Sequence, residues 1–346
     1  MKIAQIIPSL LQFGPVIVAN DLSKLLVERG HEVTVFYFDE KPGNLLTFPC
    51  KTQQIKMSEK IDFNAFDVVH CHGIRPDIYV WKYRKKSDKA KFVSTIHAFL
   101  YEDIKSTYNP LIAKMVTPIW LRILRKPDVR VVLSKQALKY YEKAFKGLKT
   151  VCVYNSRITD RSITPTEEEK EELLKFKGDK VLLGVNAGLT PRKAVDVIIN
   201  ALPLLEECKL FIAGDGKVRQ ELEQLAKDSG VTERVHFAGY RRDAFKYIPY
   251  YDIYMMPSRA EGFPLALLEA MSMKCNAVVS DIPIFKEFFT NEEVTFFKLD
   301  DWQDCAKAVK YAINHNKGEQ AYNKYMSDYS PEIFVENYLK VYRGEI

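Results

Sequence analysis

The sequence predicts an α/β protein with two doubly wound domains, each built around a parallel sheet. The chain has 346 residues, which suits two domains at roughly 100–200 residues each. Short apolar segments rich in β-branched residues alternate with segments of helical periodicity along the whole chain. Such alternation is typical of βαβ units and therefore of a parallel sheet.

The first half of the chain begins with a predicted strand at 2–9 (KIAQIIPS). A turn at 13–15 leads into a helical pattern at 16–30 that ends at a glycine. The next strand, 31–38, is rich in β-branched and aromatic residues. Further strands are expected at 67–73, 91–97, 129–134 and 150–155. We expect these segments to form an N-terminal domain over residues 1–158.

Composition changes at 157–180, which is polar and charged. Thr164-Pro165 suits a helix start there, with glutamates in the first turn, so we expect the domain junction in this segment. A second domain is predicted over 159–330, with strands at 180–188, 209–216, 234–240, 252–258 and 276–280 and helices at 195–205, 218–230 and 265–273. Residues 331–346 follow a serine, begin with proline and are amphipathic, which predicts a final helix.

Composition limits the class of protein. With 47% hydrophobic and 28% charged residues, the chain is globular rather than disordered. A net charge of +6 permits an anionic ligand or an anionic membrane surface. Six scattered cysteines without CxxC spacing predict reduced, packed thiols. The chain starts like a strand rather than a signal peptide, and no run approaches the ~18 apolar residues of a spanning helix, so we expect a cytoplasmic protein.

Three segments of the second half place glycine where a predicted strand ends, at the sheet edge that binds ligands in open α/β folds. In the first, 184–196, Arg192 and Lys193 lie just before a helix. A guanidinium fork and an ammonium together suit a diphosphate, although a solvated basic pair is the alternative. Basic charge opposes the dipole at a helix start, which favours an anionic partner.

The second segment, 213–222, contains Gly214-Asp215-Gly216. It resembles half of a GxGxxG fingerprint, but Arg219 occupies the third glycine position. A tight turn between strand and helix accounts for both glycines. The segment therefore argues against a nicotinamide cofactor.

The third segment is SRAEGFPLALLEAMS, 258–272. Pro264 is expected to be the first residue of a helix, which would leave the amides around Gly262 to Leu265 as unpaired donors suited to an oxyanion or a phosphate. Glu261 lies in the loop and Glu269 more than one turn inside the helix, and both carboxylates could accept hydrogen bonds from sugar hydroxyls. From the spacing alone, a helix-start glutamate followed by an exposed one explains the pattern equally well.

The segment PSRAEGFPLALLEAMSM resembles the E-x7-E signature of retaining family 4 glycosyltransferases with the GT-B fold. The order of motifs also fits: the basic loop, then FIAGDG, VHFAGYRRD and EGFPLALLE, with a closing helix SPEIFVENYLKVYRG. The resemblance covers essentially the full chain and is strongest from 184 to 282. It implies two Rossmann-like doubly wound domains facing across a cleft, an acceptor-binding N-terminal domain onto which helix 331–346 packs back, and a C-terminal domain that binds a nucleotide-sugar.

The resemblance also implies residue roles in donor binding. Arg192 and Lys193 would bind the donor diphosphate, and Glu269 the ribose hydroxyls. Tyr240 and Arg241 would lie against the nucleotide base, largely through their main chain. The full set of implied donor-binding positions is Gly14, Arg192, Lys193, Gly214, Tyr240, Arg241, Glu261, Gly262, Phe263, Pro264, Leu265 and Glu269.

Two residues are expected to be catalytic. His97 ends a predicted strand where the family often has a histidine near the reacting sugar, and Glu261 would hold the donor sugar hydroxyls. Both would position and polarise groups rather than form a covalent bond. His70 and His72 share one strand face by the two-residue period, as a metal pair would, but no third ligand is evident. We therefore expect a packed pair and no metal site.

The chain departs from the family pattern in three places. Family members often have arginine where this chain has Gly188, glycine where it has Ala194, and paired glycines in the first loop where it has Gly14 followed by Pro15. Reduced basic contact with the diphosphate is expected, with Arg192 compensating. The chain has no Asp-x-Asp motif, so we expect no cofactor and no metal, with basic residues and helix dipoles stabilising the leaving group.

Two basic segments lie in the half expected to bind the acceptor. Residues 82–91 contain six basic residues against one aspartate, and 111–126 combine large apolar residues with four basic ones and no acid. Such segments suit an anionic membrane interface, although a solvated face and a core helix explain them equally well. We therefore expect a glycan or polyprenyl-linked (lipid-linked) acceptor, with peripheral contact on the inner face of the cytoplasmic membrane. Nucleic acid is not expected, because the basic residues and aromatics of these segments do not follow the pattern of any known nucleic-acid-binding module.

The function predicted is transfer of a hexose-type sugar from a UDP- or GDP-sugar, with retention of configuration, in surface polysaccharide or glycolipid synthesis. Two alternatives remain open at this point. One is another GT-B enzyme, such as a nucleotide-sugar 2-epimerase, against which EGFPLALLE argues. The other is a non-catalytic nucleotide-sugar-binding partner, which the glycine at position 188 keeps open.

Overall fold

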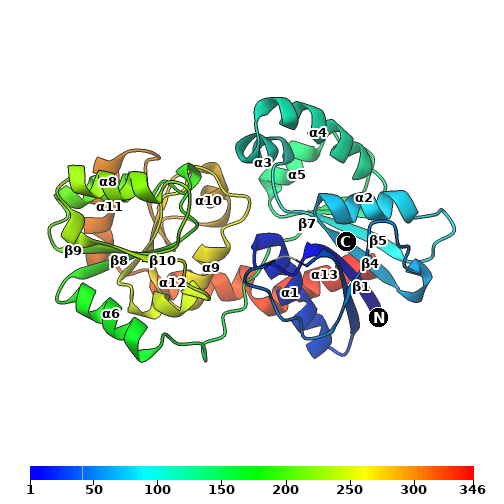
Figure 1. Cartoon of the computed structure of the whole chain (residues 1–346), viewed down its shortest axis with the longest axis horizontal. Coiled ribbons are helices and arrows are strands. Elements are labelled where there is room, and N and C mark those ends of the chain that lie inside the picture. The colour runs from blue at the N-terminus through cyan, green and yellow to red at the C-terminus, as the bar shows by residue number, and fades with distance from the viewer. Residues whose placement is uncertain (41) are drawn as a thin grey trace. The chain divides into compact units, whose positions relative to one another are not determined.

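The chain divides into two compact units in the computed structural model, which describes residues 1–40 and 42–346. Unit 1 comprises Met1–Arg157 and Ser330–Ile346, and unit 2 comprises Ile158–Tyr329. Each unit has its own parallel sheet with helices packed against it (Figure 1). The prediction of an α/β protein with doubly wound parallel sheets is confirmed.

Unit 1 is built on a sheet in the order β3-β2-β1-β4-β5-β6-β7. Each neighbouring pair is parallel, and the register pairs Ile3 of β1 with Val33 of β2 and with Val68 of β4. The central strands are almost wholly buried, as apolar runs covered on both faces must be. The strands are β1 Lys2–Ser9, β2 Glu32–Asp39, β3 Lys51–Gln54, β4 Val68–His72, β5 Lys91–Ile96, β6 Val129–Val132 and β7 Thr150–Cys152.

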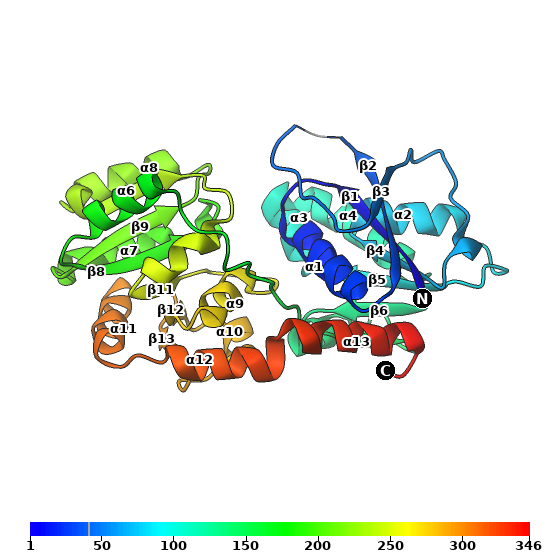
Figure 2. The same cartoon turned by 90° about the horizontal axis from the view of Figure 1, so that it is seen from below.

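The helices of unit 1 are α1 Gly14–Glu28, α2 Ile74–Tyr83, α3 Leu100–Thr107, α4 Pro110–Ile123, α5 Lys135–Tyr141 and α13 Pro331–Arg343. Side-chain caps begin several of them; the Ser330 hydroxyl, for example, accepts from the N–H of Ile333 at the start of α13. Helix α13 packs beside α1 (Figure 2), and the Lys91 ammonium donates to the carbonyl of Tyr342 at 2.8 Å. The final helix therefore belongs to the same unit as the N-terminus.

Unit 2 is built on a sheet in the order β10-β9-β8-β11-β12-β13, again with parallel neighbours. Its first strand, β8, lies between β9 and β11, so the strand order reverses beside β8. In open α/β sheets ligands bind outside the carboxyl ends of the strands at such a reversal. The strands are β8 Val181–Asn186, β9 Cys208–Ala213, β10 Val235–Gly239, β11 Ile253–Met256, β12 Asn276–Ser280 and β13 Thr295–Phe297.

The helices of unit 2 are α6 Glu167–Lys177, α7 Val195–Ala201, α8 Arg219–Asp228, α9 Leu265–Ser272, α10 Pro283–Phe288, α11 Trp302–Asn314 and α12 Gly318–Lys324. The helix start predicted at Thr164-Pro165 was placed too early, because Thr166 and Glu169 form a reciprocal capping box that begins α6 at Glu167. Helices α7 and α11 pack together and contribute Ile198, Val309 and their neighbours to one buried apolar core with β8 and β9.

Two expectations about the whole chain can be compared with this structure. All six cysteines are free thiols, as predicted. Within the described ranges, 1–40 and 42–346, no helix has both the length and the apolar character needed to cross a bilayer.

Candidate active site

Three loops of unit 2 leave the carboxyl ends of β8, β9 and β11, beside the reversal in strand order. The loops after β8 and β11 are tied together by Arg259, whose N–H donates to the carbonyl of Arg192 at 2.8 Å. The Arg259 guanidinium donates to Asp196 and to Asp300, each at 2.7 Å. Sequence reasoning missed Arg259, because its partners lie 41 and 63 residues away in the chain.

The centre of this site is an ion pair between the Lys193 ammonium and the Oε1 atom of Glu261, 2.6 Å apart. The Ser258 hydroxyl donates to the same oxygen at 2.6 Å, and Ser258 is held in turn by a hydrogen bond from Ser280 to its carbonyl. Glu261 is only 9% exposed. Among the residues that the structure describes, none hydrogen-bonds its second oxygen, Oε2. The carboxylate is thus held in place by one oxygen while the other can accept a ligand hydroxyl.

The second glutamate, Glu269, is half-buried on α9. The pKa of the Tyr254 hydroxyl, on β11, is affected by the charges of both Glu261 and Glu269. Burial raises the pKa of Tyr254 well above its usual value, and the negative charges of Glu269 and, more weakly, Glu261 raise it further. Both carboxylates therefore lie within electrostatic range of one buried tyrosine. The E-x7-E spacing brings its two acids to one region of the site.

Arg192 and Lys193 form a short 3-10 turn, Pro191–Lys193, directly before α7. The Arg192 side chain is exposed, and no described residue hydrogen-bonds its guanidinium. Ala194, which follows, is fully buried with φ 51° and ψ 37°. A left-handed residue at this turn explains why glycine would be favoured there. The basic pair thus stands at a helix start, as the sequence predicted.

Gly214 permits a close approach between two loops. A β-carbon on Gly214 would lie 1.8 Å from the carbonyl oxygen of Ala187, and one on Gly216 would lie 2.2 Å from that of Leu189. The Leu189 N–H donates to the carbonyl of Asp215 at 2.9 Å, which fixes the contact. Gly214 therefore has a structural role in shaping the loop after β8, and its contact with a ligand stays a prediction.

The start of α9 differs from expectation. Pro264 precedes the helix, with φ −85° and ψ 63°, instead of being its first residue. The Leu265 N–H donates to the carbonyl of Phe263 at 3.0 Å, so the expectation of an unpaired donor at Leu265 was wrong. The tight turn at Phe263–Leu265 consumes this donor, and the Phe263 ring packs on Phe288 with centroids 4.9 Å apart. Gly262 lies partly exposed within the same loop.

The loop after β10 carries the two residues expected near a base. Tyr240 is 55% exposed, which leaves a ring face open for stacking. The Arg241 guanidinium instead donates to Glu172 of α6 at 2.9 Å, and Glu172 also pairs with His236 at 2.8 Å. The Arg241 side chain thus holds α6 against the sheet, so base contact by Arg241 would have to use its main chain.

The remaining predicted residues, Gly14 and His97, lie in unit 1. Gly14 is the first residue of α1, and apart from its chain neighbours and its own helix backbone, no atom of the described residues lies within 4 Å of the place where its β-carbon would stand. His97 is half-buried at the end of β5, and its Nε2 lies 3.0 Å from Nδ1 of His72. Burial lowers the pKa of His97 to about 3, so its imidazole is neutral at neutral pH.

His70 and His72 are fully buried on β4, with ring centroids 4.2 Å apart. His70 bonds the Tyr342 hydroxyl at 2.8 Å and the Thr95 hydroxyl at 2.7 Å, which fastens α13 to the sheet. This is the packed arrangement that the sequence favoured over a metal pair. No group of three or more His, Cys, Asp or Glu side chains is arranged to hold a metal ion in the part of the chain that the structure describes.

Comparison with known proteins agrees with this geometry. Residues 14–161 match the family model described as "Glycosyltransferase Family 4", and 165–329 match "Glycosyl transferases group 1". The chain is 31% identical over 305 residues to the Escherichia coli "O-antigen biosynthesis glycosyltransferase WclY", covering 86% of this chain and 84% of that protein. It is also 22% identical over 284 residues to the E. coli "UDP-Gal:alpha-D-GlcNAc-diphosphoundecaprenol alpha-1,3-galactosyltransferase", covering 78% and 72% of the two chains.

Solved structures resemble the whole chain. The crystal structure of Anabaena Alr3699/HepE in complex with UDP and glucose superposes with a TM-score of 0.81 at 15% identity and covers 99% of both chains. At this identity the likeness concerns the fold alone, which is GT-B. Two parallel-sheet Rossmann-like units, the two family models and the WclY match together lead to one conclusion: the chain is a glycosyltransferase that belongs to family 4 and has the GT-B fold.

Proposed function

We propose that the chain transfers a hexose from a nucleoside-diphosphate sugar with retention of configuration and without a metal ion. The observation that carries this proposal is the buried Glu261 carboxylate, held through Oε1 by Lys193 and Ser258 while Oε2 has no partner among the described residues. A rigid acceptor of hydroxyl hydrogen bonds beside an ammonium suits a donor that joins a sugar to a diphosphate.

In the proposed reaction, the bond between the anomeric carbon and the diphosphate oxygen breaks and an acceptor hydroxyl oxygen takes its place. Negative charge then develops on the nucleoside diphosphate, where Lys193 and the exposed Arg192 would stabilise it. Glu261 would orient the sugar hydroxyls and Glu269 the ribose. A carboxylate fixed by two hydrogen bonds to one oxygen suits positioning better than nucleophilic attack. We therefore propose front-face substitution, with the leaving phosphate accepting the acceptor's proton.

His97 is proposed to contact the donor sugar or the acceptor as a neutral imidazole. Its contact with His72 Nδ1 at 3.0 Å fixes the ring by one nitrogen and leaves the other for substrate. Tyr240 is proposed to stack on the base. UDP is the nucleotide we propose first, with GDP as the alternative, because HepE was solved with UDP.

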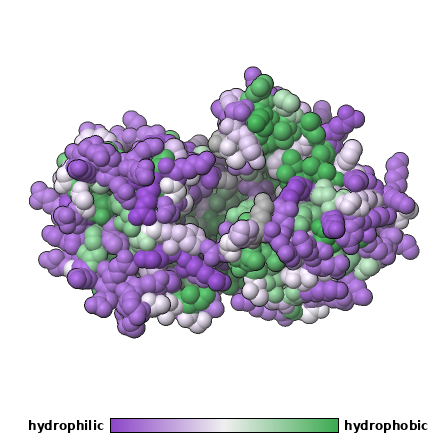
Figure 3. Space-filling model, in the orientation of Figure 1, coloured by the Kyte–Doolittle hydropathy of each residue, from purple (hydrophilic) through white to green (hydrophobic). Residues whose placement is uncertain are grey.

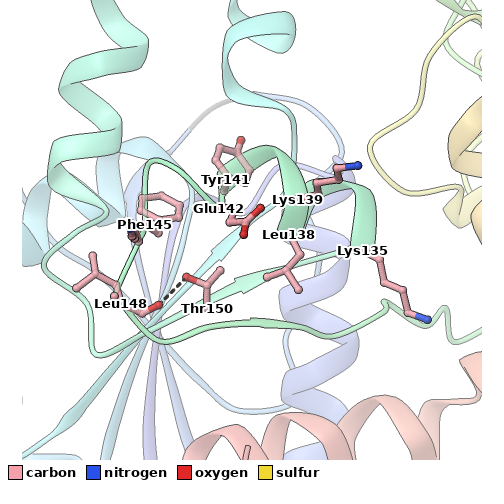
Figure 4. Close-up of a pocket in the computed structure, with 10 residues that line it drawn as sticks. Lys135, Leu138, Lys139, Tyr141, Glu142, Phe145, Leu148 and Thr150 are labelled. Carbon is pink, nitrogen blue, oxygen red and sulfur yellow. Dashed lines mark hydrogen bonds between the residues drawn. The ribbon is translucent and has the colours of Figure 1, made fainter.

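The acceptor is proposed to be a lipid-linked glycan in surface polysaccharide synthesis. The named relatives act in O-antigen biosynthesis and on a diphosphoundecaprenol-linked sugar. Unit 1 supports an amphiphilic ligand, because a cavity of about 550 Å³ beside α5 has apolar walls from Leu138, Phe145 and Leu148. Lys135 and Lys139 extend from the same helix (Figure 4). An enzyme acting on such an acceptor would work at the inner face of the cytoplasmic membrane as a peripheral protein.

The decisive experiment compares Glu261→Ala with the wild type on a panel of UDP- and GDP-sugars. The variant should keep its fold and lose turnover, while Glu319→Ala, at an exposed position of the same unit, should keep both. Unchanged turnover in Glu261→Ala would refute the site. Detection of a C2-epimerised sugar nucleotide would identify an epimerase, and donor binding without any product would identify a non-catalytic partner.

Retention, metal independence and the acceptor need separate measurements. NMR of the product should show the anomeric configuration of the donor, and inversion would contradict the mechanism. Turnover should survive removal of divalent cations with a chelator. Transfer to a polyprenyl-diphosphate-linked sugar should exceed transfer to the same sugar without the lipid, and equal rates would contradict a lipid-linked acceptor.

A further inference from the structure

Helix α4 of unit 1 presents a large apolar face to solvent. Its inner face is buried at Ala113 and Thr117, and the Trp120 Nε1–H donates to Asp77 at 2.8 Å. The outer face carries Leu111, Met115 and Ile119, spaced four residues apart and therefore aligned along the helix. These three side chains are 68%, 63% and 61% exposed. Figure 3 shows an apolar patch at its top right, over the position of α4 in Figure 1.

A basic pocket lies at the C-terminal end of the same helix. A hollow of about 660 Å³ is lined by Trp81, Lys82, Arg122, Arg125 and Lys126, and no carboxylate lines it. The Lys126 ammonium donates to the Trp81 carbonyl at 2.6 Å, and Arg125 donates to the carbonyl of Ala144 at 2.7 Å. Because both acceptors are uncharged carbonyl oxygens, the positive charges of Lys126 and Arg125 are not neutralised by these bonds. Four cations thus converge beside an indole that is 47% exposed.

The helix geometry joins these two features. From Leu111 to Ile119 the helix rises about 12 Å, and Arg122 follows only about 4.5 Å farther along the axis. Interfacial helices insert an apolar face to the depth of the headgroups while basic residues meet anionic lipid, and tryptophan prefers that same depth. The apolar stripe and the pocket are therefore close enough along the helix to meet one bilayer surface together.

We propose that Leu111, Met115 and Ile119 enter an anionic lipid leaflet while the pocket at Trp81, Lys82 and Arg122 binds a lipid headgroup phosphate. This rests on the proposed function, because it supplies the surface on which a lipid-linked acceptor is met. A bilayer is the occupant that the charges favour, since the outer face of α4 carries Lys114 and Arg122 and the helix has no acidic residue.

The proposed lipid-binding surface, formed by α4 and the pocket, includes only part of the basic segment 82–91 that the sequence analysis assigned to the membrane interface. Arg84 is paired with Asp128 and the carbonyl of Lys126, and Lys91 is bonded to the carbonyl of Tyr342. Of the residues in that segment, Lys82 lines the pocket. The specific prediction is therefore that α4 and Lys82, and not Arg84 or Lys91, determine lipid binding.

The experiment is co-sedimentation of the full chain with phosphatidylcholine vesicles, with and without phosphatidylglycerol. The wild type should bind only the anionic vesicles, and more weakly as salt increases. Met115→Asp/Ile119→Asp should abolish binding, and Lys82→Glu/Arg122→Glu should weaken it by more than the roughly fivefold expected for each cation removed. The matched controls Leu204→Asp and Lys307→Glu change exposed residues of unit 2 and should bind normally.

Three outcomes would overturn the proposal. The first is unchanged vesicle binding by Met115→Asp/Ile119→Asp with the melting temperature of the wild type. The second is full competition by inorganic phosphate, which would identify a site for free phosphate. The third is a wild-type dimer that these substitutions dissociate, which would identify an interface between copies of the chain. A UDP-induced rise in melting temperature should persist in every variant; its absence from the wild type would count against the proposed function instead.

Discussion

The Lys193–Glu261 ion pair makes the sharpest prediction about the site. The two side chains are 19% and 6% exposed, and the charged atoms are 2.6 Å apart. Removing one partner of a buried pair costs about 3–5 kcal/mol, because an uncompensated charge stays buried. Lys193→Met should therefore destabilise unit 2 by about 3 kcal/mol, the lower end of that range, because the ammonium keeps some contact with water.

The same reasoning makes the effects of two substitutions non-additive. Glu261→Gln keeps an oxygen that can accept from both Lys193 and Ser258, so it should cost about 1–2 kcal/mol. In the double variant no buried charge is left without a partner. It should therefore be more stable than Lys193→Met alone, with a coupling free energy of about 1.5 kcal/mol or more.

The assay is urea unfolding followed by hydrogen exchange of the peptides that contain β8 and β9, which reports on unit 2 by itself. Lys274→Met provides the matched control, because Lys274 pairs with Glu319 at 2.9 Å but the side chains are 47% and 67% exposed. An exposed pair of this kind contributes about 1 kcal/mol or less. The buried-pair reasoning is refuted if Lys193→Met destabilises unit 2 no more than Lys274→Met does. It is also refuted if the effects of Lys193→Met and Glu261→Gln on the free energy of unfolding simply add.

Three further predictions concern the loops of unit 2 and the core of unit 1. Gly214→Ala should lower the free energy of unfolding by about 1–3 kcal/mol, because its β-carbon would lie 1.8 Å from a carbonyl oxygen. Gly188→Ala, whose β-carbon has its nearest contact at 4.0 Å, should change that free energy by no more than about 1 kcal/mol. Equal melting temperatures of the two variants would contradict this prediction. Arg259→Lys should speed hydrogen exchange in residues 187–194 and weaken UDP binding about tenfold, because one ammonium cannot bond Asp196 and Asp300 as the guanidinium does. Unchanged hydrogen exchange would exclude a role for Arg259 in holding the loop after β8. Unit 1 should lose stability on acidification from about pH 6 to 4. Burial holds the pKa of His70 and His97 near 3 and that of His72 well below 6.5 in the folded chain. The unfolded chain therefore binds three more protons at these histidines in that pH range. Burial raises the pKa of Asp77 to about 7, so the folded chain binds one proton more at Asp77, which opposes the effect of the histidines. The free energy of unfolding should therefore change by about 2.7 kcal/mol per pH unit. Urea midpoints for hydrogen exchange of the β4 and β5 peptides measure this change, and equal midpoints at pH 6 and pH 4 would contradict it.

Periodicity and loop composition determined the architecture. Alternating strand and helix patterns predicted both parallel sheets, because each buried strand needs an apolar run and each covering helix an apolar stripe. The ordered glycine turns, the basic pair at 192–193 and the E-x7-E segment predicted a donor site at one sheet edge and indicated the family. The comparisons confirm the family. These features are local, so a linear sequence displays them directly.

Side-chain partners depended on the tertiary structure. The ion pair of Lys193 with Glu261 spans 68 residues, and the bond between His72 and His97 spans 25. The pairing of the Arg241 guanidinium with Glu172 was not predicted, and the Leu265 amide was expected to be free, yet it is bonded within a tight turn. Such pairings depend on strand order and on the exact path of each loop, and neither is encoded in hydrophobic periodicity. The sequence by itself thus determined which chemical groups gather at the sheet edge. Only the tertiary structure decided which of them neutralise one another, and that Oε1 of Glu261, not Oε2, is the oxygen held by Lys193 and Ser258.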